Sequence, residues 1–337
     1  MVPGQYGLVL HGPRAKDQEP RIALVTIVHY PGDSRPQHWR HPVLALGNFD
    51  GVHRGHVKII ERVRRAAEEH AASAIAMTFD PHPPRIVRPD KAPPVLMTTQ
   101  QKLEALSKAG IHGVAIVRFT HELSRWDPET FVRTVLVEWM RVAEVWVGAN
   151  FLFGRDRSGN FSILRSLGAR YGFRAEKIDP VRYKDFVVSS TRIRRLISEG
   201  RVDEAGALLG HHYYVDGSVI QGQRRGRDLG FPTANVCADN ELIPPRGVYA
   251  TTTQVDGVFH PSVTNIGIRP TFDAAGGQMT VETHLLDFDA ELYGRKLRIG
   301  FVQRLREERR FENLDALRAQ IGADCEQART LFDSMSL

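Results

Sequence analysis

The ten residues GNFDGVHRGH, positions 47–56, stand between an apolar run and a helical pattern. Residues 42–47 (PVLALG) have the length and composition of a buried strand, and from about residue 55 to 70 apolar side chains recur at helical spacing. A second apolar run of strand length follows at residues 73–79. Strand, helix and strand in this order predict a βαβ unit with parallel strands and a right-handed crossover.

The same alternation continues along the next seventy residues. Helices are predicted at 99–109 and 128–140, and strands at 113–119 and 144–148. This order is typical of a doubly wound α/β domain. Residues 81–94 contain six prolines, so we expect an irregular loop there, and long loops at strand ends often carry function.

After residue 210 the pattern changes from alternating to β-rich. The predicted strands, separated by Gly, Pro and Asp turns, are 212–220, 248–255, 262–268, 279–288 and 297–303. Few helices intervene, so we expect antiparallel pairing in a sandwich or a small barrel. A final amphipathic helix is predicted to begin at an Asn313 cap and to run through Leu331.

The length of 337 residues favours two domains. We expect an N-terminal extension over 1–40, a first domain over 41–197, a linker over 198–211 and a second domain over 212–337. The extension holds one short strand candidate at residues 22–28, which is too short for a membrane span and lacks the flanks of a secretory signal. The cytoplasm is therefore the expected location.

The composition is that of an ordinary globular protein, with 42% hydrophobic and 25% charged residues. The net charge of +6 suits an anionic ligand such as a nucleotide, but it is small for a nucleic-acid binder. We expect neither a nucleic-acid nor a membrane partner, and no oligomeric state is predicted. Cys237 and Cys325 lie far apart, which argues against a disulfide-built fold and a thiolate zinc site.

The turn at residues 47–56 has the features of an anion site. It follows a strand of a doubly wound sheet, at the edge where ligands bind, and it leads into a helix N-terminus. His53 and His56 are three residues apart and can face one side of the helix, while Gly55 allows a phosphate to approach the backbone. Two imidazole donors there would stabilise charge on the α-phosphate of a nucleotide.

This stretch resembles the HxGH signature of the nucleotidylyltransferases. The whole stretch GNFDGVHRGH resembles the adenylyltransferase module of prokaryotic bifunctional riboflavin kinase/FAD synthetases (FMN adenylyltransferases). Three further segments agree in order, TFDPHP at 78–83, VGANFLFG at 147–154 and SSTRIR at 189–194. The resemblance implies a Rossmann-like nucleotidylyltransferase fold for the first domain.

The matched motifs carry the expected ligands of this domain. His53 and His56 are expected to be catalytic. Asp80 and Asn150 are expected at strand ends, where they would bind the polar edges of the flavin or of the nucleotide, and we assign both to the flavin. The residues expected to bind ATP are Gly47, Phe49, Asp50, Gly55, Ser189, Ser190, Thr191 and Arg194, with Arg192 as the alternative to Arg194. Taken alone, the last motif also fits an ordinary serine cap with surface arginines.

The second domain opens with a loop rich in glycine and arginine, GQRRGRDLGFPTAN at 222–235. Its glycines allow the backbone to wrap a phosphate, and those expected at the ATP are Gly222, Gly226 and Gly230. Thr233 and Asn235 are two apart, so on a strand both face one side and can offer oxygens to Mg²⁺ bound with ATP. No P-loop, GxGxxG or HExxH motif occurs.

This loop resembles the kinase module of the same family. The segments GVYA at 247–250, NIGIRPTF at 265–272, ELYG at 291–294 and FVQRLR at 301–306 agree with it. Within VETH at 281–284, Glu282 occupies the place of the family's catalytic glutamate, which accepts a proton from the riboflavin 5′-hydroxyl. The resemblance covers residues 43–335 and implies a riboflavin kinase-like antiparallel β-barrel with a terminal helix.

The resemblance implies two activities on one chain. The second domain would phosphorylate riboflavin to FMN with Mg-ATP, and the first would adenylylate FMN to FAD with release of pyrophosphate. The expected ligands are thus riboflavin, FMN, FAD and ATP. Two alternatives stay open, a nucleotidylyltransferase for another acceptor fused to a flavin-binding module, and a non-catalytic regulator that binds flavin or RNA.

Overall fold

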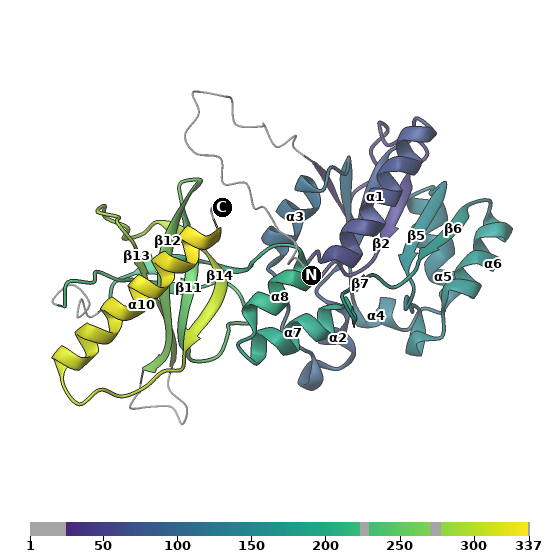
Figure 1. The fold of residues 1–337 in the computed structure, drawn as a ribbon. Helices are drawn as coiled ribbons and strands as arrows, with labels where there is room; N and C mark the ends of the chain where they lie inside the picture. Colours follow the sequence, from purple (N-terminus) through teal and green to yellow (C-terminus); the bar gives the residue numbers. More distant parts are fainter. Residues whose placement is uncertain (1–24, 223–228, 270–277, 336–337) are drawn as a thin grey trace. The chain divides into compact units, whose positions relative to one another are not determined.

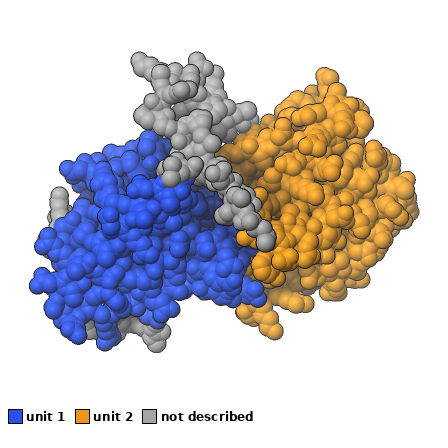
Figure 2. Space-filling view, viewed as in Figure 1, with its two compact units in different colours: residues 1–19, 193–337 blue, residues 20–192 orange. Residues whose placement is uncertain are grey.

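The computed structural model describes residues 25–222, 229–269 and 278–335. The chain forms two compact units, which meet along the sequence between Arg192 and Ile193 (Figure 2). The predicted domain limits at residues 197 and 212 stay predictions. Within the described ranges, no helix combines the length and the apolar composition that a membrane span needs.

The unit of residues 20–192, orange in Figure 2, is built on a parallel sheet of six strands (Figure 1). Its strands in chain order are β1 (Thr26–Tyr30), β2 (Val43–Leu46), β3 (Ala74–Asp80), β4 (Gly113–Arg118), β5 (Glu144–Gly148) and β6 (Arg174–Ile178). They lie side by side in the order β1-β4-β3-β2-β5-β6. The predicted βαβ unit and its parallel pairing are confirmed, whereas β6 had no prediction.

Helices cover both faces of this sheet because alternate side chains of each strand point to opposite sides. Val43 and Ala45 of β2 belong to a core shared with α1 (Arg54–Glu69) and α3 (Thr99–Lys108). Leu44 and Leu46 belong to a second core, against the helices that follow β4 and β5. These helices are α5 (Pro128–Phe131), the π-helical segment η2 (Val132–Trp139) and α6 (Phe161–Tyr171). The unit is therefore doubly wound, as predicted.

The proline-rich segment 81–94 corrects one expectation. It was predicted to be an irregular loop, yet it holds a short helix, α2 (Pro83–Val87), and a 3₁₀ turn, η1 (Pro89–Lys91). Each begins with proline, whose fixed φ suits the first helical position and whose missing N–H is not needed there. The remaining short elements of this unit are α4 (His121–Ser124), η3 (Arg155–Arg157) and the hairpin β7 (Arg182–Tyr183) and β8 (Phe186–Val187).

Part of the region 1–40 belongs to the folded sheet, which the sequence alone left open. β1 pairs in parallel with β4, from Thr26 beside Gly113 to Tyr30 beside Val117. Trp39 is fully buried, and a β-carbon on Gly113 would lie 2.2 Å from its ring. The strand candidate at 22–28 thus overlaps the edge strand, and Trp39 packs in a space that only glycine leaves open.

The unit that includes residues 193–337, blue in Figure 2, contains a closed antiparallel barrel of six strands. They are β9 (Tyr213–Ile220), β10 (Ala234–Ala238), β11 (Gly247–Val255), β12 (Val258–Arg269), β13 (Gln278–Leu285) and β14 (Lys296–Arg306), in the spatial order β10-β13-β12-β11-β14-β9. The predicted small barrel is confirmed. Its interior contains hydroxyl groups that hydrogen-bond one another, on Thr251, Thr253, Ser262, Thr264 and Thr283.

Among the described residues, the helices that belong to this unit or lead into it are α7 (Ser190–Ser198), α8 (Val202–Leu209) and α10 (Leu314–Met335). The predicted linker 198–211 is therefore mostly helical, and α8 contacts β9 and β14. The terminal helix α10 is capped by Asn313, as predicted, through a 2.8 Å bond from the Ala316 amide. It covers the outer face of β11 and β12, where Val248, Ala250 and Val263 pack with Cys325 and Ala328.

A buried ion pair ties α10 to the barrel. Asp324 is 2% exposed and accepts hydrogen bonds from Arg306 at 2.8–3.0 Å and from Gln320 at 2.7 Å. Replacing Asp324 by alanine would leave the Arg306 guanidinium partly buried without its carboxylate. We expect Asp324→Ala to lower the free energy of unfolding of the barrel unit by about 3–5 kcal/mol in urea denaturation. Glu326→Ala, on the exposed side of α10, should change it by less than about 0.5 kcal/mol.

Candidate active sites

Three strand ends converge at one edge of the parallel sheet. β2 lies between β3 and β5, so the direction in which the chain adds strands reverses there, and a crevice forms at such a point. The turn 47–56 follows β2, Asp80 ends β3 and Asn150 lies two residues beyond β5. The motifs that the sequence singled out in the first domain are thus brought to a single edge.

His53 and His56 stack on each other at the start of α1. Their ring centroids are 3.7 Å apart with an interplanar angle of 11°. His53 is the N-cap, and its Nδ1 accepts the backbone N–H of His56 at 3.3 Å. Because Nδ1 is the acceptor, the neutral ring carries its proton on Nε2, which makes that nitrogen a hydrogen-bond donor.

Gly55 leaves room for this arrangement. A β-carbon at this position would lie 3.1 Å from both Cε1 and Nδ1 of His53, closer than ordinary van der Waals contact. The predicted reason for glycine was the approach of a phosphate. The structure adds another reason, since glycine lets the His53 ring fold back onto its own helix.

His56 is held in the neutral state. Burial, followed by the neighbouring His53 and Lys102, lowers its pKa well below the ordinary value of 6.5. Within the described part of the chain, its buried Nδ1 has no hydrogen-bond partner. The Phe49 ring packs edge-on against it, with centroids 5.2 Å apart. A neutral imidazole with an unsatisfied nitrogen is suited to a partner that arrives with the ligand.

Phe49 and Asp50 build the turn rather than expose side chains to a nucleotide. Phe49 is completely buried and has a φ of +48°, a strained conformation for a bulky residue. Asp50 is 2% exposed, and its carboxylate accepts the Leu96 amide at 2.8 Å. Any ATP contact of Phe49 therefore falls on its backbone. Gly47 packs on the Phe49 ring, where a β-carbon would lie 3.6 Å away.

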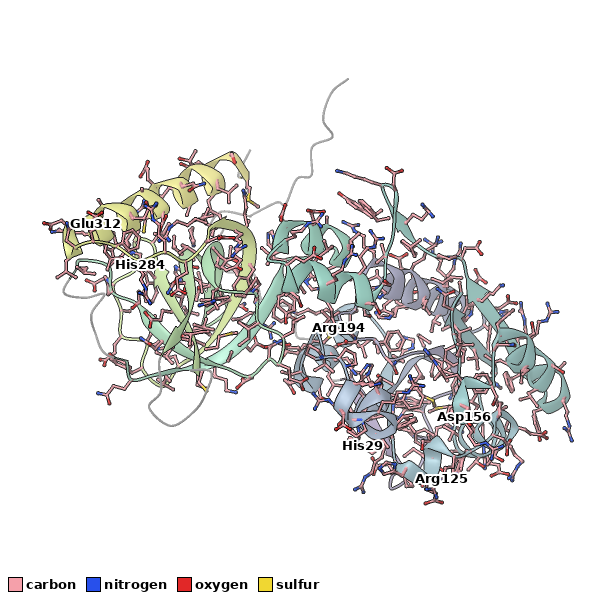
Figure 3. The ribbon with its side chains drawn as sticks, turned by 90° about the horizontal axis from the view of Figure 1, so that it is seen from below. His29, Arg125, Asp156, Arg194, His284 and Glu312 are labelled. Carbon is pink, nitrogen blue, oxygen red and sulfur yellow. The ribbon has the colours of Figure 1, made fainter. Side chains whose placement is uncertain are left out.

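The SSTRIR motif is joined to this turn. The Ser190 hydroxyl donates to the Asp50 carbonyl at 2.8 Å, and the Ser189 hydroxyl accepts the Arg192 amide at 3.3 Å as the cap of α7. Both serines thus use their hydroxyls for structure, while Thr191 is exposed. Arg194, labelled in Figure 3, lies further along α7, in the compact unit that contains the barrel.

Lys102 is a functional candidate that sequence reasoning missed. It is 8% exposed, and its Nζ donates to the Thr78 hydroxyl at 3.4 Å. Burial lowers its pKa, while Asp50 and Asp80 act in the opposite direction. The sequence does carry one indication of this role. Lys102 lies one turn before the buried Leu106, and a lysine in the apolar stripe of a helix is unusual.

A pocket of about 320 Å³ opens beside β5. Its lining residues are Ala149, Asn150, Phe151, Leu152, Asn160, Phe161, Ser162 and Lys177. Aromatic and aliphatic walls with an amide and a cation suit a flat, polar-edged ring, and the Lys177 ammonium lies 5.2 Å from the Phe161 ring centroid. Asn150, the predicted flavin contact, lines this pocket. Asp80 is not among these residues; it is exposed and accepts a bond from Thr99 at 3.5 Å.

A row of polar side chains crosses the outer wall of the barrel. Glu282 of β13 is paired in register with Asn235 of β10 on one side and Asn265 of β12 on the other. The alternation of the strands places all three outward, since Thr283 and Ala234 beside them are buried. Asn265 was not predicted as a site residue, because the register between strands cannot be read from spacing.

Gly222, at the start of the predicted phosphate loop, packs directly on this row. A β-carbon on Gly222 would lie 2.2 Å from the Asn235 side-chain nitrogen, so only glycine fits here. Gly230 has a φ of +86°, in the left-handed region that glycine tolerates. Gly226 lies outside the described residues. Thr233 and Asn235 flank the buried Ala234, and with Glu282 they offer hydroxyl, amide and carboxylate oxygens, a donor set that fits Mg²⁺.

The neutral state of His56 has a consequence for stability. The unfolded chain takes up a proton at this residue near pH 6.5, whereas the folded chain does so only at lower pH. Acidification below pH 6.5 therefore favours unfolding, by at most about 1.4 kcal/mol per pH unit. We expect His56→Asn to lose less stability than the wild type between pH 7 and pH 5 in urea denaturation. Parallel loss in the two proteins would contradict the depressed pKa.

Two family models match the chain, one in each unit. The FAD synthetase family matches residues 35–192, and the riboflavin kinase family matches residues 209–332. A solved structure titled as a macrolide-efflux protein from Streptococcus pneumoniae has a TM-score of 0.82 at 25% identity, over 90% of this chain and 99% of that one. That likeness supports the fold of both units.

Curated relatives extend the match over most of the chain. The bifunctional riboflavin kinase/FMN adenylyltransferase of Pseudomonas fluorescens is 40% identical over 297 residues, which cover 88% of this chain and 94% of the relative. The enzyme of the same description from Bacillus subtilis is 34% identical, over 87% of this chain and 93% of the relative. With both family models in the predicted order, the chain belongs to the family of bifunctional riboflavin kinase/FMN adenylyltransferases.

Proposed function

We propose that the barrel unit phosphorylates riboflavin to FMN and that the parallel-sheet unit transfers AMP from ATP to this FMN. The observation that carries the proposal is that each unit matched by its family model contains its own polar constellation. One is the Asn235–Glu282–Asn265 row, and the other is the stacked pair His53 and His56 at the start of α1. A barrel that only bound flavin would not need the Glu282 row.

In the kinase step, Glu282 is the general base. Its carboxylate accepts the proton of the riboflavin 5′-hydroxyl as the hydroxyl oxygen attacks the γ-phosphorus of ATP. The bond between that phosphorus and the β–γ bridging oxygen breaks, and ADP leaves with the electron pair. We assign the triphosphate to the side of this carboxylate, because Gly222, at the start of the predicted phosphate loop, lies directly against Asn235.

Thr233 and Asn235 are the residues that we assign to Mg²⁺. When bound, the ion neutralises phosphate charge as ADP leaves. The oxygen chemistry of these side chains and the tight glycine contact at Asn235 support the assignment. Among the described residues, no cluster of three or more His, Cys, Asp or Glu forms another metal site.

In the adenylyl transfer, the protein positions two phosphates and stabilises charge. A phosphate oxygen of FMN attacks the α-phosphorus of ATP, the bond to the α–β bridging oxygen breaks, and pyrophosphate leaves. The Nε2–H of His53 and the backbone amide of Gly55 in the first turn of α1 are the donors that we assign to the charge that develops on the α-phosphate. His56, neutral before the nucleotide arrives, gains its partner from the ligand.

FMN is placed by the pocket beside Asn150. Phe151, Leu152 and Phe161 supply apolar surface for the isoalloxazine ring, and the Asn150 amide can pair with its polar edge. Asp80 stays a proposed flavin contact outside this pocket. The cytoplasmic location and the absence of nucleic-acid and membrane partners stay predictions.

One incubation tests both activities. Purified protein with riboflavin and Mg-ATP should form FMN first and FAD later, as separated by chromatography. FMN without FAD would contradict the proposed role of the histidine site. Riboflavin left unchanged, with supplied FMN also unconverted, would contradict the whole proposal.

The two sites should fail separately. Glu282→Gln should lower FMN formation by about 10²- to 10⁴-fold, because the base is lost, and leave adenylylation of supplied FMN unchanged. His56→Ala should do the converse. Glu312→Gln, an exposed carboxylate before α10, is the matched control and should alter neither rate. Loss of both activities from either of the first two changes would refute two independent sites.

Lys102 should matter for adenylylation alone. Lys102→Met keeps the length of the side chain and removes the buried charge at the carboxyl edge of β3. We expect the adenylylation rate to fall about 10- to 100-fold, the cost of one hydrogen bond to a charged group, without loss of thermal stability. Lys91→Met, at an exposed lysine in η1, is the control and should leave the rate unchanged.

A further inference from the structure

His284 belongs to the VETH segment but has no role in the chemistry above. It lies on β13 two residues after Glu282, so both side chains emerge on the outer face of the barrel wall. Its Nδ1 lies 2.7 Å from the carbonyl oxygen of Pro232 (His284 is labelled in Figure 3). A carbonyl oxygen can only accept, so the imidazole is the donor and Nδ1 carries the proton.

The Pro232 carbonyl lies where the strand ladder has ended. The pairing of β10 with β13 begins at Ala234 opposite Thr283, so the preceding residues have no backbone partner on β13. Pro232 itself has no N–H to offer. The hydrogen bond from the His284 imidazole to the Pro232 carbonyl therefore links the two chain segments just beyond the end of the β10–β13 ladder. Here a side chain is the donor in place of a backbone amide.

The segment is anchored on its other side by Phe231. The Phe231 ring packs edge-on against His284, with centroids 5.6 Å apart and an interplanar angle of 87°. It also belongs to the core beneath α10, together with Ile321 and Leu331. Thr233 thus lies between the half-buried Phe231 ring, the His284 hydrogen bond and the first residue of the ladder.

We propose that His284 is a positioning residue, which holds the Pro232–Thr233 peptide so that the Thr233 hydroxyl faces the metal beside Glu282. This inference rests on the proposed role of Thr233 as a Mg²⁺ ligand. A residue that orients a metal ligand through a hydrogen bond changes metal affinity by about 10- to 100-fold when it is removed. Because His284 contacts Pro232 and Phe231, we expect its loss to act through the metal ligand Thr233 and to leave the carboxylate of Glu282 in place for the proton transfer.

Replacements of different shape separate the hydrogen bond from packing. The side-chain amide of asparagine reaches about as far as Nδ1 of histidine, so His284→Asn can keep the donor to Pro232. His284→Leu fills the space against Phe231 and removes the donor. His260→Leu is the matched control, because His260 packs edge-on against Phe288 at 4.9 Å in the same barrel.

The first measurement is metal binding without turnover. Free Mn²⁺ is followed by electron paramagnetic resonance in the presence of the full chain and ADP. We expect His284→Leu to weaken Mn²⁺ binding about 10- to 100-fold, His284→Asn to stay within about threefold of the wild type, and His260→Leu to have no effect. Wild-type Mn²⁺ affinity in His284→Leu would overturn the proposal, and so would equal weakening in the leucine and asparagine variants.

Activity and stability complete the test. The Mg²⁺ concentration that gives half-maximal FMN formation should rise in His284→Leu by the same factor, while adenylylation of supplied FMN and the thermal transition stay as in the wild type. Thr233→Ala is measured in parallel. If it leaves Mn²⁺ binding unchanged, the metal assignment of the proposed function is wrong; if it weakens binding and His284→Leu does not, only the role of His284 is wrong.

Discussion

The turn after β2 keeps its shape because the buried carboxylate of Asp50 accepts the Leu96 amide. A buried carboxylate is costly unless it is well bonded, so this contact fixes both the turn and the end of the proline-rich segment. The carbonyl of the same residue accepts the Ser190 hydroxyl and so joins the start of α7 to the turn. The first turns of α1 and α7 are thereby held relative to the strand that lies at the reversal point of the sheet.

In both units, side chains hydrogen-bond irregular backbone beside the candidate site. Each must hold irregular backbone where no ladder or helix provides hydrogen bonds, and each uses a side chain for the purpose. In the parallel-sheet unit, the side chains of Asp50 and of the N-cap residue His53 accept backbone amides. In the barrel, the side chain of His284 donates to a backbone carbonyl. Phosphate chemistry depends on fixed donors more than on reactive side chains, so such supports are part of the catalytic apparatus.

The sequence predicted the architecture well where periodicity is strong. The strands at 73–79, 113–119 and 144–148 and the helix at 55–70 are confirmed, because buried parallel strands and an amphipathic helix leave clear patterns. The short helix α2 was missed, since proline reads as a breaker although it is favoured at a first helical position. β6 was missed because only two of its five residues, Ala175 and Ile178, are apolar, and two charged residues between them break the alternation that is typical of a strand.

The site was predictable only as far as local motifs reach. Asn265 and Glu282 meet through strand register, and His284 reaches Pro232 across fifty residues of sequence, so neither contact has a local signature. Lys102 needed knowledge of which face of α3 is buried. Phe49 and Ser189 show the opposite limit: both lie in the correct motif, yet their side chains serve packing and capping.

The hydroxyl-lined interior of the barrel restricts which sequences can share this fold. The five side chains satisfy one another inside a space without exposed surface, so Thr264 bonds to both Thr251 and Thr283. Replacing one threonine by valine keeps the volume but leaves the neighbouring hydroxyls without hydrogen-bond partners. Replacing all five polar residues by apolar ones leaves no hydroxyl unsatisfied. Homologous barrels should therefore carry this group as a block, either largely polar or largely aliphatic, with mixed versions rare. The inner lining would then vary through coordinated changes, independently of the row on the outer wall.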